Sequence, residues 1–303
     1  MRKVIDFHAH MGDIFTGKNV SFRTGLTRPE DLDDCFSEND RAGFTFKAEG
    51  KSAAELQARM ASGQKRLRYA TCENIGKTLD RENGSYSVIL PVTPYTGFDE
   101  YLAASRLEPR LLPFTNPDFA RTRADMMAKL RADIKCGARG LKVHPVLQNI
   151  NLSDPRVHEA VELFGEAGLP VLVHVGQSSY YLHDQEADYP TTPEFGKLED
   201  FVALAHRYPR YDFVAAHCGK NYPSKLAQLT AGLEHVYTDT TFCAAAQIRE
   251  AVEHLGEDKV LLGTDYPFSD LHYAVLQVEL ALEADSPAAE KVLYGNAARL
   301  LRL

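Results

Sequence analysis

Eight short apolar segments recur along this chain, and helical stretches lie between them. Strands that are apolar on both faces and joined through helices are typical of a parallel sheet covered by helices. Eight such units predict an α/β fold, a (β/α)8 barrel. A doubly wound sheet is the alternative, but it would not bring the first and eighth strands together. The predicted strands are Lys3–His10, Ser87–Val92, Leu111–Phe114, Gly140–His144, Pro170–Val175, Asp212–His217, Val236–Thr240 and Val260–Thr264.

The intervening segments contain good helix formers and recognisable helix ends. Asp154 followed by Pro155 predicts an N-cap with proline at the first helical position. Asn296 is expected to cap a short final helix. The other predicted helices are Ala120–Lys135, Arg156–Ala167, Lys197–Arg207, Pro223–Ala231, Ala244–His254 and Ala274–Glu283.

Met11–Gln64 does not fit the eightfold rhythm. A structureless loop of this length is improbable in a compact domain, so the segment is expected to form a cap near the C-terminal rim of the barrel. Its aromatic side chains are predicted to form an apolar wall of the substrate pocket, because they are too many to leave in solvent. The alternative is packing against the outer helices or a second subunit. These residues are Phe15, Phe22, Phe36, Phe44 and Phe46.

The composition and net charge of the chain limit the classes of partner that it is expected to bind. The 303 residues, 44% apolar and 25% charged, are expected to form a single domain over 1–303 with the insertion inside it. A net charge of −8 without a Lys/Arg-rich run argues against nucleic acid. No apolar run approaches the ~20 residues of a membrane helix, and no secretory signal is visible. Five cysteines without a CxxC spacing indicate a reduced, cytoplasmic protein. The expected partner is a small-molecule substrate, and assembly into a homo-oligomer stays open.

Two histidines, His8 and His10, end the first strand. Side chains alternate faces along a strand, so both point the same way and Ala9 faces away. Burying two imidazoles without partners would cost free energy, whereas the pair can close on one metal ion.

Further polar residues follow later strands at the end where barrel enzymes carry their active sites. Their convergence on one mouth predicts a metal site, because imidazole and carboxylate together suit zinc or a similar divalent ion. Asp265 can bind the ion and accept a proton from its water, and His217 can act on that water or on the substrate's oxygen. The residues are Lys142, His144, His174, His217 and Asp265.

The motifs resemble the amidohydrolase superfamily of barrel metalloenzymes. His8-x-His10, the strand-end His174 and His217, and Gly-Thr-Asp265-Tyr-Pro carry the resemblance. Gly-Leu-Lys142-Val-His144-Pro, Ala-His217-Cys-Gly and Tyr-Gly-Asn-Ala-Ala-Arg-Leu-Leu near the end are similar to its amidohydrolase-related branch, which includes aminocarboxymuconate-semialdehyde decarboxylase.

The resemblance implies four ligands for one divalent ion, His8, His10, His174 and Asp265, with His217 as the catalytic partner. Binuclear members carry a carboxylated lysine on strand 4, so Lys142 and His144 are candidates for a second ion or for substrate. We expect one ion per chain rather than two. A plain ammonium on Lys142, neutralising Asp265 or binding a substrate carboxylate, is the alternative.

Three residues on loops at this face are further candidates for substrate binding: Tyr180, His183 and Tyr266. The predicted activity is hydrolysis of an amide, lactone or ester-like bond through a metal-activated water. A metal-dependent non-oxidative decarboxylase is the alternative, but it needs a cation beside the substrate carboxylate, and no motif places an arginine there. A non-catalytic metal-binding barrel is a second alternative, which the spare His217 disfavours.

Overall fold

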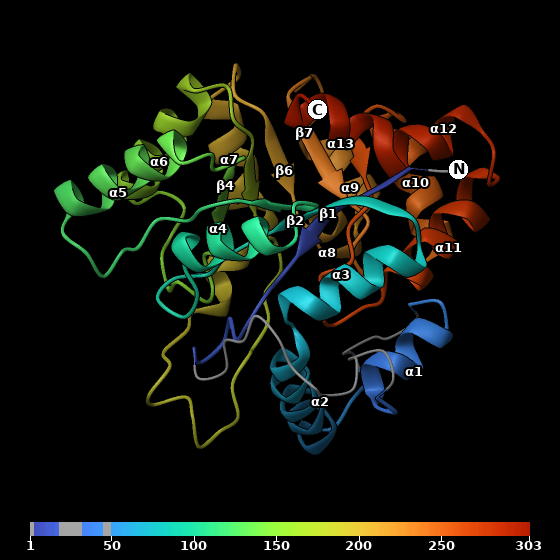
Figure 1. Ribbon diagram of the computed structural model, residues 1–303, viewed down its shortest axis with the longest axis horizontal. Coiled ribbons are helices and arrows are strands. Elements are labelled where there is room, and N and C mark those ends of the chain that lie inside the picture. Colours follow the sequence, from blue (N-terminus) through green and yellow to red (C-terminus); the bar gives the residue numbers. More distant parts are fainter. Residues whose placement is uncertain (1–2, 18–31, 45–49) are drawn as a thin grey trace.

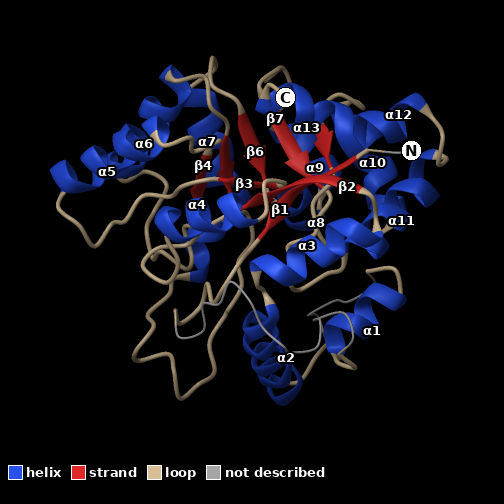
Figure 2. Cartoon of the chain, viewed as in Figure 1, coloured by secondary structure: helices blue, strands red, loops and turns tan. Residues whose placement is uncertain are grey.

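The computed structural model describes residues 3–17, 32–44 and 50–303. Within these ranges eight parallel strands alternate with helices, as predicted, and Figure 2 shows the strands at the centre with helices around them. Two ladders, β1-β2-β3 and β4-β5-β6-β7-β8, account for all of them. The strands are β1 (Val4–Ala9), β2 (Gly84–Ile89), β3 (Leu111–Pro113), β4 (Leu141–Val143), β5 (Val171–Val173), β6 (Phe213–Ala215), β7 (Val236–Asp239) and β8 (Val260–Leu261).

Two seams close the ladders into a ring. Thr115 bridges to Leu141 between β3 and β4. At the other seam Ala9 bridges to Tyr266, and the Asp265 N–H donates to the His8 carbonyl at 2.7 Å. The first and last strands are therefore neighbours, which confirms the barrel and excludes the doubly wound sheet.

The helices begin and end close to the predicted positions. Asp154 caps α6 with Pro155 in its first turn, as expected. The expectation for Asn296 is wrong: a continuous helical run crosses it, and its amide instead donates to the carbonyls of Glu257 and Val260. The flanking helices are α3 (Cys72–Arg81), α4 (Phe98–Leu107), α5 (Arg123–Lys135), α6 (Pro155–Glu166), α7 (Leu198–Arg207), α9 (Pro223–Leu229), α10 (Ala245–Leu255), α11 (Leu271–Leu282), α12 (Pro287–Glu290) and α13 (Asn296–Leu301). None of the helices in the described ranges is long and apolar enough to cross a membrane.

Part of the insertion folds into two helices, α1 (Cys35–Arg41) and α2 (Ala53–Arg66), which lie apart from the helices around the barrel (Figure 1). We call residues 32–44 and 50–69 the cap. It ends beyond the predicted Gln64, because α2 runs on to Arg66 and into a 3-10 turn. The cap contacts the loop after β5: Gln64 Nε2 donates to Gln185 Oε1 at 2.7 Å, and Gln57 Oε1 accepts from the His183 N–H at 3.1 Å.

Candidate functional site

His8 and His10 are each fixed from behind. His8 Nδ1 lies 2.8 Å from Asp239 Oδ2, and His10 Nδ1 lies 2.7 Å from the Leu90 carbonyl oxygen. An oxygen partner on Nδ1 sets the tautomer and leaves Nε2 facing inward, as in metal-binding histidines. The period of two along β1 thus delivers both imidazoles to one face, as the sequence predicts.

Asp265 follows β8 and faces the same two rings. Its Oδ1 lies 3.0 Å from His10 Nε2 and 3.5 Å from His8 Nε2. Because the Leu90 carbonyl can only accept, His10 Nδ1 holds the proton of the neutral ring and Nε2 presents a lone pair to a carboxylate oxygen. Two acceptors at this distance call for a cation between them.

His217 and His174 form a second, connected pair beside these ligands. His217 Nε2 lies 3.0 Å from His174 Nδ1, and Tyr180 Oη lies 2.9 Å from His174 Nε2. Burial lowers the pKa of His217 to about 3 and that of His174 well below its usual value. With the His174 proton on Nε2, where the Gly176 carbonyl accepts at 3.2 Å, the pair leaves a lone pair on His217 Nδ1. That atom is buried and has no partner among the described residues.

The backbone that carries His217 is unusual. The five residues of α8 (His217–Asn221) all have positive φ, between 48° and 67°, so the segment is a left-handed turn. Asp265 also has a positive φ, of 57°. Non-glycine residues in this region cost roughly 1 kcal/mol or more each and cluster at functional sites. This backbone conformation directs the side chains of His217 and Asp265, which follow two different strands, toward His8.

The donor set fits a divalent ion. Ligand atoms of His8, His217 and Asp265 all lie within 4.8 Å of one another, and His10 contacts the same carboxylate oxygen. Among the residues that the structure describes, this group of possible metal ligands includes His217 and not His174. His174 instead contacts Tyr180 and His217. Three of the four ligands that the resemblance implies thus meet directly, and His174 lies one ring further out.

Lys142 and His144 contact the histidines of this cluster: Lys142 contacts His8, and His144 contacts His174. Lys142 is fully buried, its Nζ is 3.3 Å from His8 Nε2, and burial lowers its pKa to about 8. Its electrostatic interaction with Asp265 suits the neutralising role of the ammonium. His144 stacks on His174, with ring centroids 3.9 Å apart and an interplanar angle of 8°.

A cavity of about 530 Å³ opens above these residues. Described cap residues form one side of it, as the sequence predicts for the insertion, whereas Phe22 and Phe46 lie outside the described residues. Phe15 stacks on Phe268 in the cavity lining, at 5.7 Å between centroids. The aromatic residues that line it are Phe15, Phe36, Phe44, Tyr180, Phe242 and Phe268.

Two cations that the sequence analysis missed also line the cavity. Lys220 lies on the left-handed turn, and its Nζ donates to Ser178 Oγ. Arg59, on α2, has its guanidinium 4.3 Å from the Phe36 ring centroid. Burial and then Arg59 lower the pKa of Lys220 to about 8. No sequence motif identifies either residue as part of the site, because the place of each side chain in space depends on the path of a loop or of the cap.

The three candidate substrate-binding residues fall in different places. Tyr180 lines the cavity and contacts His174. His183 lies at its rim, largely exposed and 3.3 Å from Glu186. The expectation for Tyr266 is wrong: its side chain is buried in the cluster between the barrel and α3, α10 and α11. The loop after β8, in which Asp265 has a positive φ, directs Asp265 to the cavity and Tyr266 into the core.

Asp239 is a further residue of the candidate site, and its position at the end of an apolar strand could have identified it from the sequence. It ends β7, holds His8 Nδ1, and accepts from the His217 N–H at 2.9 Å. Burial alone would raise the pKa of Asp239, but His8 outweighs it and holds that pKa well below the usual range. The motif Val-Tyr-Thr-Asp239 carries an acid at the end of an apolar strand, the same pattern that identifies Asp265.

Comparison with known proteins identifies related sequences and folds. The sequence model of the amidohydrolase family matches residues 5–303. A search of curated proteins gave no significant match.

Solved structures with similar folds include two decarboxylases. A dihydroxybenzoic acid decarboxylase from Polaromonas, with bound manganese and the inhibitor 2-nitroresorcinol, has a TM-score of 0.65 at 16% identity, covering 100% of this chain and 98% of its own. 5-Carboxyvanillate decarboxylase from Sphingomonas paucimobilis has a TM-score of 0.63 at 16% identity with full coverage of both chains.

A probable 2-pyrone-4,6-dicarboxylic acid hydrolase from Acinetobacter baumannii has a TM-score of 0.57 at 15% identity and covers 99% of each chain. At these identities the likeness establishes the barrel fold.

Proposed function

Because this chain belongs to the amidohydrolase family, we propose that it is a metal-dependent hydrolase that cleaves an amide, lactone or ester-like bond in a small molecule. The observation that supports this most is the convergence of His8 Nε2, His10 Nε2 and Asp265 Oδ1 beside the unpartnered Nδ1 of His217. The cavity above them is the size of a small-molecule site.

We propose that His8, His10, His174 and Asp265 hold one zinc or similar divalent ion, which requires one ring nitrogen of His174 to give up its hydrogen bond to His217 or Tyr180. Such an ion acts as a Lewis acid and lowers the pKa of a bound water toward ~7. His217 takes a proton from the attacking water, whose oxygen adds to the acyl carbon. The bond to the leaving nitrogen or oxygen then breaks, and that atom receives the proton. The ammonium of Lys142 balances the charge of Asp265.

A metal-dependent non-oxidative decarboxylase is the second candidate. Lys220 and Arg59 line the cavity, and this reading requires a cation beside a substrate carboxylate. The aromatic walls fit an aromatic acid, and two of the similar structures are decarboxylases of such acids.

Turnover by the metal-loaded protein distinguishes the candidates. We would incubate it with panels of lactones, N-acyl compounds and aromatic carboxylates, and measure acid release and carbon dioxide release separately. Acid release that disappears in His217→Asn supports the hydrolase, whereas carbon dioxide from the aromatic acids supports the decarboxylase. A metal-loaded protein that turns over none of the panels would favour the non-catalytic barrel.

A further inference from the structure

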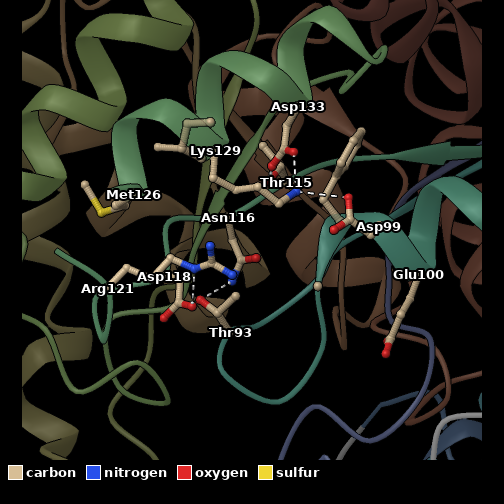
Figure 3. A pocket seen from close by; sticks show the side chains of 13 residues that line it. Thr93, Asp99, Glu100, Thr115, Asn116, Asp118, Arg121, Met126, Lys129 and Asp133 are labelled. Atoms are coloured by element: carbon tan, nitrogen blue, oxygen red, sulfur yellow. Dashed lines mark hydrogen bonds and ion pairs between the residues drawn. The ribbon is translucent and has the colours of Figure 1, made fainter. Parts of the chain in front are cut away.

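A second pocket, of about 210 Å³, lies between α4 and α5 and the loops that follow β2 and β3 (Figure 3). None of the candidate metal ligands lines it. We call it the outer pocket. Its polar groups are arranged differently from those of the barrel mouth, and two of them, on Asn116 and Glu100, have a buried oxygen without a hydrogen-bond partner among the described residues.

The first of these groups is the side-chain carbonyl of Asn116. The residue is 5% exposed, and its Nδ2 donates to Thr93 Oγ1 at 3.0 Å. Its Oδ1 has no hydrogen-bond partner within the described ranges. Figure 3 shows this oxygen turned away from Thr93, toward the open space inside the ring of lining residues. A buried acceptor without a donor costs free energy that a ligand can recover.

The neighbouring hydrogen bonds fix the orientation of this amide. Gln148 Oε1 accepts from the His144 N–H at 2.9 Å, so its Nε2 donates to the Pro117 carbonyl at 2.7 Å and to Thr93 Oγ1 at 3.1 Å. The Thr93 hydroxyl gives its own proton to Pro117, also at 2.7 Å. Thr93 can then only accept from Asn116, which must present its NH₂ to Thr93 and its carbonyl oxygen to the pocket.

The charges of the pocket favour a cation over an anion. Both basic residues are already paired: Arg121 with Asp118 at 2.9 Å, and Lys129 with Asp99 at 3.0 Å and with Asp133. A further carboxylate, Glu100, has a buried Oε2 with no partner in the described part of the chain. Burial and Asp99 raise the pKa of Glu100. The lining carboxylates Asp99, Glu100, Asp118 and Asp133 thus outnumber the cations Arg121 and Lys129.

Part of the lining is apolar, formed by Phe98, Met126 and Leu130. We propose that the outer pocket binds a small alkylammonium ligand. An N–H of its ammonium group donates to Asn116 Oδ1, its charge meets the surplus of carboxylates, and its methylene groups pack on the apolar part of the lining. This site is independent of the proposed reaction.

The test is calorimetric titration of the metal-loaded protein, at low salt, with 1,4-diaminobutane and n-butylamine. We expect both to bind, the diamine more tightly, and added salt to weaken both. Butyrate and n-butanol of the same length should not bind. Asn116→Leu should weaken diamine binding by about tenfold or more, the scale of a hydrogen bond from a charged donor.

Glu100→Gln provides a second variant that keeps size and shape, and it should weaken binding by roughly threefold, as expected for one partly exposed charge. The controls are Glu234→Gln, whose carboxylate is 93% exposed elsewhere, and His217→Asn at the barrel mouth. Neither should change the affinity. The proposal is overturned if neither amine binds, if both pocket variants bind as the wild type does, if butyrate binds better, or if His217→Asn abolishes binding.

Discussion

The pocket at the barrel mouth and the outer pocket both lie at the C-terminal ends of strands, but their charged groups are arranged in opposite ways. In the mouth, His8, His10 and Asp265 direct lone pairs at one another. In the outer pocket, Lys129 and Arg121 are already matched by carboxylates. Acceptors that face each other need a cation between them, and such an ion can take part in a reaction. Ion pairs that are already matched, beside the unpartnered oxygens of Asn116 and Glu100, suit ligand binding alone. Substitutions should therefore have very different consequences in the two places.

The largest difference should come from the ligands. His8→Ala or Asp265→Ala should reduce the bound divalent ion from about one per chain to near zero and abolish activity, because the first variant removes one imidazole donor and the second removes the carboxylate charge that attracts the ion. Asp133→Asn, in the outer pocket, is the matched control and should keep the ion. Elemental analysis after gel filtration measures this. Undiminished metal in both ligand variants would contradict the assignment, and a content near two would move Lys142 into the site as a carbamate.

The next prediction separates the two outer imidazoles of the mouth. His217→Asn should keep the ion and lower kcat by ~10² or more, the usual scale for general acid–base and electrostatic roles. His174→Ala should instead lose the ion. The structure makes this a sharp test, because a His217 nitrogen lies within 4.8 Å of the His8 and Asp265 ligand atoms. Metal loss from His217→Asn with retention in His174→Ala would exchange the two roles.

Lys220 should matter for anionic substrates. Lys220→Met is expected to raise KM for a carboxylate substrate by about tenfold, the scale of one charge-assisted hydrogen bond, with little change in kcat. A lysine is charged below its pKa. With that pKa near 8, wild-type kcat/KM for an anion should fall as pH rises through about 8. The variant should lose this dependence.

Lys225→Met is the matched control for Lys220, since its exposed ammonium pairs with Glu199 outside the cavity. An unchanged KM in Lys220→Met, or an equal rise in the Lys225 variant, would remove Lys220 from substrate binding.

The smallest effect on activity should come from the outer pocket itself. Lys129→Met leaves the buried carboxylate of Asp133 without its cation and should lower the free energy of unfolding by ~1–3 kcal/mol. Because Lys129 lines the outer pocket and does not line the cavity at the barrel mouth, kcat should not change. Urea denaturation and steady-state kinetics measure the two quantities. A fall in kcat at unchanged stability would mean that the two pockets are not separate.

The sequence was sufficient for those features that depend on local periodicity. Alternation along β1 placed His8 and His10 on one face, and apolar runs ending in a polar residue located His174, His217 and Asp265. It was insufficient where the direction of a side chain depends on the conformation of a loop. Tyr266 turns into the core, and the left-handed turn carries Lys220 into the cavity, although no residue pattern encodes either.

Asp239 shows a different kind of gap. The rule that identifies Asp265 also applies to it, but a search guided by histidines passes over a strand that ends in an acid alone. Asn296 was assigned by a residue preference at helix starts, which the tertiary contacts of its amide with Glu257 and Val260 override.

The seam between β1 and β8 joins the two ends of the chain, and the candidate ligands lie on both sides of it. An ion held by His8, His10 and Asp265 would therefore link the first strand to the last, and the barrel could not open at this seam without releasing it. Ion binding would then raise the free energy of unfolding, because only the folded chain brings these ligands together. The ion would stabilise the folded chain by about 4 kcal/mol at a free concentration a thousandfold above its Kd. The availability of the ion would thus govern the lifetime of the protein as well as its turnover.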